Sequence, residues 1–144
     1  MFENFDEFTP YDFIDFSKEI YDNLDDESNL NSAYQRVIYS RIYYGTFLYV
    51  REWLKKYWGY NSSTKDHTKM LNFIKTSGPF GFFLNSKIAD DLKTLKILRH
   101  QADYYITVPE EGSIKYSQWI FESIDYAFEL SHSIIEHVNE IEVP

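Results

Sequence analysis

Apolar residues recur at helical spacing along most of the chain, and turn residues divide this pattern into five segments. The predicted helices cover residues 10–26, 30–58, 67–76, 86–105 and 115–141. Pro10 suits a first helical position, and Asn85 is expected to cap the fourth helix. No segment alternates apolar and polar residues as a strand does. The sequence therefore predicts an all-α fold, an up-down helical bundle of four long helices and one short helix.

The face of each helix that should point inward follows from steps of three and four residues. The predicted inward stripes are Phe13, Phe16, Ile20 and Leu24 in the first helix; Leu30, Tyr34, Val37, Arg41, Tyr44 and Leu48 in the second; Met70, Phe73 and Ile74 in the third; Ile88, Leu92, Leu95, Arg99, Ala102 and Ile106 in the fourth; and Ile120, Ile124, Ala127, Leu130, Ile134 and Val138 in the last. Residues 1–144 are expected to form a single domain, with residues 1–8 as a flexible acidic tail.

Composition narrows the class of protein. Aromatic residues make up 19% of the 144 residues, which excludes a disordered chain. The chain has no cysteine, which excludes a disulfide scaffold, a cysteine-based zinc site and a thiol nucleophile. The longest uncharged apolar run, residues 42–50, is far shorter than the ~20 residues of a membrane span. We therefore expect a cytoplasmic protein with no membrane segment.

Charge is distributed unevenly along the chain. Residues 1–27 carry ten acids against one base, residues 28–104 carry twelve bases against five acids, and residues 105–144 carry eight acids against one base. A basic middle is thus flanked by two acidic ends. This pattern fits either a basic surface for a polyanion or acidic and basic helices that lie side by side.

Two arginines stand on predicted apolar stripes, Arg41 in the second helix and Arg99 in the fourth. An unpaired buried guanidinium costs several kcal/mol, so each needs a partner. Asp103, one turn after Arg99, is the nearby acid that can serve. One interpretation is an interhelical lock between Arg41 and Asp103, completed by the hydroxyls of Tyr44 and Tyr104. The other is a positively charged cleft in which Arg99 holds a phosphate.

Two motifs resemble those of a known family. The segment SRIYYGTF at residues 40–47 resembles the R-x-Y-Y-x-x-F second-helix signature of HEPN domains. The segment LKILRHQADY at residues 95–104 resembles the L-x-x-L-R-x-x-A-D-Y stretch of small prokaryotic HEPN proteins. His67, which opens the third helix, falls where many of these proteins carry a histidine. The resemblance covers about residues 28–138 and implies a HEPN-like bundle.

The resemblance also implies a site. Many HEPN proteins are metal-independent ribonucleases that dimerise along the motif helices and form one composite site from two R-x4–6-H motifs. Arg99 corresponds to the motif arginine, and His100 takes the polar position after it. Tyr104 stands where the shortest spacing puts the catalytic histidine. Tyrosine, with a pKa near 10, is a poorer base at neutral pH than histidine, so the motif is degenerate.

Three functional hypotheses follow. In the first, the chain is a HEPN-like protein of a prokaryotic toxin–antitoxin or defence system that acts on RNA as a homodimer. Arg99 would then contact the scissile phosphate, and Tyr104 or His100 would replace the missing histidine. In the second, it is a non-catalytic dimeric module that binds RNA, a nucleotide or a partner protein. The third is an unrelated helical interaction protein whose acidic ends recognise a basic partner.

Other groups enter the hypotheses with smaller roles. The resemblance implies a cognate antitoxin or a nucleotidyltransferase as a partner. His67 either lines the cleft between the helices or is simply a first-turn residue. His132 and Glu136 have a spacing that suits a metal pair, but no second cluster supplies further ligands. We therefore expect neither a metal nor another cofactor.

Overall fold

The computed structural model describes residues 10–23, 31–61, 67–104 and 124–141. These residues form five helices and no strand, which confirms the all-α fold. The helices are α1 (Pro10–Asp22), α2 (Asn31–Trp58), α3 (His67–Ser77), α4 (Phe82–Tyr104) and α6 (Ile124–Asn139). Within the described ranges, no helix has both the length and the hydropathy that crossing a membrane would require.

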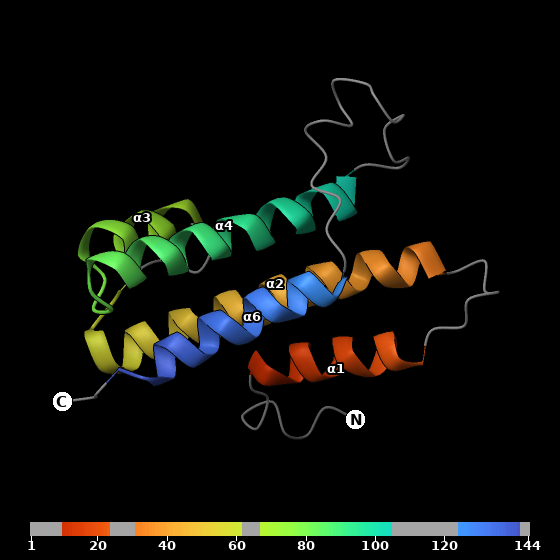
Figure 1. The fold of residues 1–144 in the computed structure, drawn as a ribbon, viewed down its shortest axis with the longest axis horizontal. Helices are drawn as coiled ribbons and strands as arrows, with labels where there is room; N and C mark the ends of the chain where they lie inside the picture. The colour runs from red at the N-terminus through yellow and green to blue at the C-terminus, as the bar shows by residue number, and fades with distance from the viewer. Residues whose placement is uncertain (1–9, 24–30, 62–66, 105–123, 142–144) are drawn as a thin grey trace.

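Four of the helices run alternately up and down (Figure 1). The order α1, α2, α4, α6 reverses direction at each step, and the short α3 lies over α4 at one end of the molecule. The α2 helix is central, because it packs against α1, α4 and α6, while α3 packs against α4. The predicted up-down arrangement with one short extra helix is thus present in the described part of the chain.

The core confirms the predicted inward faces of two helices. In α4, Ile88, Leu92, Leu95 and Ala102 are all buried. In α6, the predicted stripe is buried at Ile124, Ala127, Leu130, Ile134 and Val138. In α6 one broad face is turned toward the bundle, so a single stripe describes it well. In α4, which packs against α2, α3 and α6, Ala89 and Leu98 beside the stripe are buried as well. Met70 and Ile74 of α3 are buried as predicted, whereas Leu24, Leu30, Ile106 and Ile120 lie outside the described residues.

The predicted inward face of α2 was wrong by about one residue. Val37 and Tyr34 are exposed, at 40% and 42%, although both belong to the predicted stripe. The fully buried positions lie beside that stripe, at Ile38, Ile42, Tyr43, Val50 and Leu54. Because three helices surround α2, apolar residues occur on adjacent faces, and one 4-3-4 stripe selects only the edge of the buried surface.

In α1 the prediction was wrong at Phe16, whereas Phe13 and Ile20 of the same stripe are partly buried and Ile20 packs against the core. Phe16 is 52% exposed, while Ser17 beside it is buried and donates a hydrogen bond to the Phe13 carbonyl at 2.7 Å. The cause is a close approach to α2 at Gly45. A Cβ at Gly45 would lie 2.8 Å from Ile14 Cγ1 and 2.9 Å from the Pro10 carbonyl oxygen. The residues that face this glycine, rather than Phe16, set the contact surface of α1.

Asn85 does not cap the fourth helix, because α4 begins earlier, at Phe82. Its side chain instead holds the turn that precedes the helix. Asn85 Oδ1 accepts a hydrogen bond from the Phe80 amide at 3.0 Å, and Nδ2 donates to the Gly78 carbonyl at 2.8 Å. A Cβ at Gly78 would lie 2.6 Å from Asn85 Oδ1, so this turn requires glycine there. The turn fixes how α3 is placed on α4.

The remaining boundaries agree where they can be compared. The second helix was predicted over residues 30–58 and spans Asn31–Trp58, and the third was predicted over residues 67–76 and spans His67–Ser77. The first helix begins at Pro10, as predicted. Its predicted end at residue 26, the predicted start of the last helix and the proposed tail at residues 1–8 lie outside the described residues.

Replacing Gly45 with alanine tests the contact between α1 and α2. In an open helical position this change stabilises a helix by about 1 kcal/mol. Here we expect a net loss of about 1–3 kcal/mol in the free energy of unfolding, because the added methyl overpacks the contact. Urea unfolding measures the change, with Gln35→Ala on the exposed side of α2 as control. A Gly45→Ala variant at least as stable as the parent would contradict the close approach.

Candidate functional site

Arg99 lies where α4 faces α2, and its side chain is 19% exposed. The guanidinium lies over two tyrosine rings of α2, with Cζ 5.1 Å from the Tyr44 centroid and 5.8 Å from the Tyr43 centroid. Nη2 donates a hydrogen bond to the Tyr44 hydroxyl at 2.9 Å. The largely buried guanidinium is thus surrounded by two aromatic rings and one neutral acceptor. None of these groups carries a negative charge, so the site suits an additional anionic partner.

Asp103 supplies the counter-charge to Arg99. Its Oδ2 lies 3.5 Å from Arg99 Nε, one helical turn away. Nε is buried and makes no hydrogen bond, so this ion pair is a contact of charges without good hydrogen-bond geometry. Asp103 itself is 35% exposed, and solvent screens the pair further. The Asp103 carboxylate is therefore a weak partner that an anion of better geometry can replace.

The predicted lock between Arg41 and Asp103 was wrong. In the described residues Asp103 pairs with Arg99, and the Arg41 guanidinium lies over the Phe13 ring of α1 at 5.3 Å. The physical reason is position on α2: Arg41 lies on the side toward α1, while Tyr44, the other predicted member, faces α4. Tyr44 thus belongs to the network of Arg99 and not to one centred on Arg41.

His67, at the start of α3, enters the same network. Its ring stacks on Phe47, with centroids 4.0 Å apart and an interplanar angle of 17°. It also contacts both tyrosine rings that hold Arg99, at 5.5 Å from Tyr43 and 6.0 Å from Tyr44. A hydrogen bond joins the Tyr43 hydroxyl to Nδ1 of His67. Arg99 and His67, on different helices, therefore meet the same two rings.

Tyr43 controls the protonation pattern of this cluster. Its side chain is fully buried, and burial raises the pKa of its hydroxyl well above 10, although the Arg99 charge acts in the opposite direction. The hydroxyl is therefore neutral at physiological pH and able to donate. When it donates to His67, Nδ1 is the acceptor and Nε2 carries the ring proton. This hydrogen bond orients the imidazole.

Two of the predicted catalytic residues, Arg99 and His100, point to different sides of α4. Arg99 faces α2, whereas His100, the next residue, is exposed and lines a groove between α4 and α3. One step along a helix turns a side chain by about 100°, which accounts for the separation. Tyr104 ends α4, and its side chain lies outside the described residues. Of the predicted site, the structure groups Arg99, Tyr44, Asp103 and His67.

Sequence reasoning missed three residues that shape this site. Tyr43 and Phe47 were part of the quoted motif but were given no role, although their spacing of four residues places them on one face of α2. Arg36 was missed as well. Its Nη1 donates to the Ala102 carbonyl at 2.7 Å, which ties α2 to the last turn of α4, where a positive charge is favourable.

No candidate metal centre is present in the described part of the chain, where no three histidine, aspartate or glutamate side chains form a suitable group. His132 Nε2 and Glu136 Oε2 form a surface contact at 3.7 Å, with both side chains strongly exposed.

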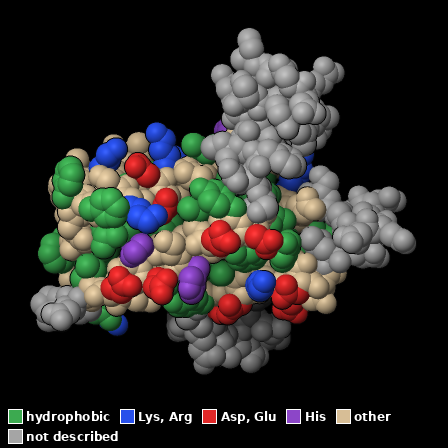
Figure 2. Space-filling model, in the orientation of Figure 1, with side chains coloured by type: hydrophobic (Ala, Val, Ile, Leu, Met, Phe, Trp, Pro, Cys, Tyr) green, Lys and Arg blue, Asp and Glu red, His purple; other side chains and the backbone are tan. Residues whose placement is uncertain are grey.

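Acidic and basic side chains lie over different parts of the molecule. Acidic side chains gather over α1 and α6, while most of the visible basic ones lie toward α3 and α4 (Figure 2).

Comparison with known proteins adds no relative: no protein-family profile, curated protein or solved structure matches the chain.

Replacing Tyr43 with phenylalanine tests the protonation of the cluster. Because the native state keeps the Tyr43 proton and the unfolded state releases it above pH ~10, this group's contribution to native stability is lost as pH rises beyond that value. We expect the free energy of unfolding to decline less steeply with rising pH in Tyr43→Phe than in the parent. The two slopes should differ by about 1.4 kcal/mol per pH unit. Urea unfolding at about pH 9 and 11 measures both slopes.

Tyr34→Phe is the matched control, because Tyr34 is exposed on the same helix. Burial also raises the pKa of Tyr49, to about 12, so Tyr49 causes part of the decline in every variant. Equal slopes for the parent and Tyr43→Phe would show that the Tyr43 hydroxyl ionises normally.

Proposed function

We propose that the chain is a HEPN-like protein that acts on RNA as a dimer, with Arg99 contacting a phosphate. One observation carries the proposal: Arg99 of α4 and His67 of α3 contact the rings of Tyr43 and Tyr44 on α2. A guanidinium can bind phosphate, and an imidazole can transfer a proton, and metal-independent RNA cleavage uses both kinds of group.

Arg99 has donors to offer an anion. Within the described residues only Nη2 makes a hydrogen bond, and its acceptor is the neutral Tyr44 hydroxyl. A phosphate accepts charge-assisted hydrogen bonds in the planar arrangement that a guanidinium presents. The phosphate would displace Asp103, whose contact with Nε lacks hydrogen-bond geometry. Asp103 thus acts as a competing internal anion in the unbound state.

His67 is the proton carrier in this proposal, in place of His100 or Tyr104. Tyr43 holds its Nδ1, and Nε2 would exchange a proton with the ribose or the leaving oxygen. His100 lines the groove between α3 and α4, on a side of α4 turned by about 100° from Arg99. The proposal also includes a partner protein of the kind that accompanies HEPN proteins, either an antitoxin or a nucleotidyltransferase.

A non-catalytic RNA-binding module is the second candidate. The observation that favours it is that Asp103 and Tyr44 give Arg99 a counter-charge and a hydrogen-bond acceptor without any substrate. In this case His67 stabilises the junction of α2, α3 and α4, and Arg99 binds phosphate without a reaction. Cleavage and binding assays on the same variants separate the two functions.

The first test is cleavage of labelled structured and unstructured RNAs in EDTA. We expect the parent to cut RNA, and His67→Ala and Arg99→Ala to lose about 10²–10⁴-fold in rate, as removal of a proton carrier or phosphate ligand does. Arg51→Ala is the matched control, because Arg51 pairs with its neighbour Glu52 on α2. Equal cutting by all variants would indicate a contaminating nuclease and overturn the catalytic proposal.

Binding gives the complementary measurement. We expect Asp103→Asn to tighten RNA binding, because it removes the competing carboxylate, and Arg99→Ala to lower the slope of log affinity against log salt by about one. Filter binding over a range of salt concentrations measures both. Binding with this pattern but without cleavage supports the non-catalytic module, and binding that neither variant alters would remove Arg99 from the RNA site.

A dimer is the expected assembly. Sedimentation of the parent should give a particle near twice 17.3 kDa, because the composite site of the HEPN type needs two copies of the motif. A clean monomer at micromolar concentration would remove the composite site and leave at most the binding role.

A further inference from the structure

A groove lies between α1 and α6, and Arg99 is not among its lining residues. The two helices run in opposite directions and both pack on α2 (Figure 1). In the described residues neither of them packs closely against the other, so the surface between them is hollow. The volume of the groove is about 670 Å³.

The groove follows both helices over more than one turn. On α1 its wall runs from Tyr11 to Lys18, and on α6 it runs from Phe128 to Asn139, in steps of three and four residues. At the rise of an α-helix the wall on α6 is about 16 Å long, which is about three turns. This length suits a short helix of another chain better than a compact small molecule.

Contacts across the groove hold both of its ends. At one end Lys18 Nζ of α1 lies 5.5 Å from the centroid of the Phe128 ring of α6. At the other end the Tyr49 hydroxyl of α2 donates a hydrogen bond to Asn139 Oδ1, and the Tyr49 ring meets the Tyr11 ring edge-on, with centroids 5.1 Å apart. These contacts fix the spacing of the two walls, and a site that is formed in advance lowers the cost of binding.

The floor of the groove is mainly apolar. Ile135 is 8% exposed, and Ile14 and Phe128 are partly buried. The Ser131 hydroxyl also belongs to the lining, but it already pairs with the Thr46 hydroxyl of α2 at 2.6 Å. The floor therefore favours contact with apolar side chains of a partner.

Both rims of the groove are acidic. Asp15 on α1 and Glu136 on α6 are exposed, and Asp15 has no ion pair among the described residues. Glu136 meets His132 at 3.7 Å on the surface, and Lys18, the one lysine of the lining, lies 3.5 Å from Asp22. Exposed pairs of this kind hold their charges weakly. Each rim thus presents a carboxylate to a positively charged partner.

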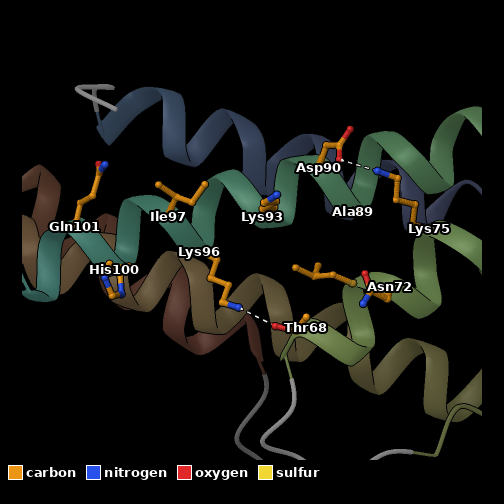
Figure 3. Close-up of a pocket in the computed structure, with 11 residues that line it drawn as sticks. Thr68, Asn72, Lys75, Ala89, Asp90, Lys93, Lys96, Ile97, His100 and Gln101 are labelled. Atoms are coloured by element: carbon orange, nitrogen blue, oxygen red, sulfur yellow. Dashed lines mark hydrogen bonds and ion pairs between the residues drawn. The ribbon is translucent and has the colours of Figure 1, made fainter. Parts of the chain in front are cut away.

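The charge around the groove has the same sign. The α1 and α6 helices together contain seven acids and one lysine, and Figure 2 shows acidic side chains gathered over both. The groove between α3 and α4 has the opposite character, because Lys75, Lys93 and Lys96 line it (Figure 3). A basic partner is therefore attracted to the groove between α1 and α6 and repelled by the groove between α3 and α4.

We infer that the groove between α1 and α6 binds a basic amphipathic helix of a partner protein. Apolar side chains at steps of three and four residues on that helix lie on Ile14 and Ile135. Its lysines or arginines, on both sides of the apolar stripe, reach Asp15 on one rim and Glu136 on the other. The inference does not depend on the proposed RNA function, because it uses different helices and a ligand of opposite charge.

A synthetic peptide of leucine and lysine tests the inference. It has about 15 residues, with its leucines on one helical face. Fluorescence anisotropy of the labelled peptide, titrated with the full chain at physiological salt, measures binding. We expect saturable binding, and at least about tenfold weaker binding of a scrambled peptide of the same composition, because its leucines form no stripe for the apolar floor.

Charge reversal at the rims tests the location. Asp15→Lys combined with Glu136→Lys should weaken binding of the peptide about ten- to a hundredfold. Glu19→Lys combined with Glu129→Lys is the matched control, because both acids are exposed on the same helices, lie outside the lining and change the net charge equally. We expect the control to change affinity by less than about threefold, since salt screens distant exposed charges. Circular dichroism checks that both double variants stay helical.

Four results would overturn the inference. Absence of saturable binding by the parent would show that the groove holds no such helix. Equal binding of the two peptides, or equal weakening by the two double variants, would show that charge alone attracts the peptide. A dimer that Asp15→Lys with Glu136→Lys converts to a monomer in sedimentation would assign the groove to a second copy of this chain.

Discussion

Burial of α2 among α1, α4 and α6 is the constraint on which the rest of the structure depends. A helix enclosed on three sides must satisfy each polar group that it carries inward. Thr46 does so through Ser131, at 2.6 Å, and through the carbonyl of its own preceding turn. Tyr43 does so through His67 at the start of α3. The polar groups of α2 therefore determine which side chains of the other helices lie against them. The contact of Tyr43 with His67 is one of these, and it forms part of the candidate site.

Arg99 is tolerated near the core because the surface that it meets is aromatic and not aliphatic. Two tyrosine rings place their electron-rich faces toward the guanidinium, and one hydroxyl accepts its hydrogen bond. The desolvation of the cation is thus offset without a strong buried carboxylate. Asp103 then adds a weak, half-exposed contact. An arginine held in this way keeps its orientation while its charge stays only partly neutralised, which is the condition that the proposed phosphate contact requires.

Sequence periodicity was sufficient where a helix has one buried face. The stripe of α6 was confirmed, because a single run of three- and four-residue steps covers most of its contact surface. The stripe of α4 was confirmed too, but it leaves out Ala89 and Leu98, which are buried because α4 packs against three helices. Periodicity failed for α2, where neighbouring faces are buried together, and for Phe16, because the contact of α1 depends on the missing side chain of Gly45. The candidate site could likewise be predicted only where its contacts are local. Arg99 and Asp103 are one turn apart and could be paired from spacing, whereas the contact of His67 with Tyr43 depends on how α3 is placed, which no local pattern encodes.

Two neighbouring residues of α4 that carry candidate chemistry lie on different sides of the helix. Arg99 and His100 are adjacent in the chain, yet one meets α2 and the other lines the groove with α3. A single phosphate therefore cannot contact both within one chain. The first turn of α3 lies between these regions, since His67 contacts the rings beneath Arg99 and Thr68 binds Lys96 in the groove. A ligand that uses both regions must be longer than one phosphate and must pass over this turn. RNA meets that requirement, and a single mononucleotide does not.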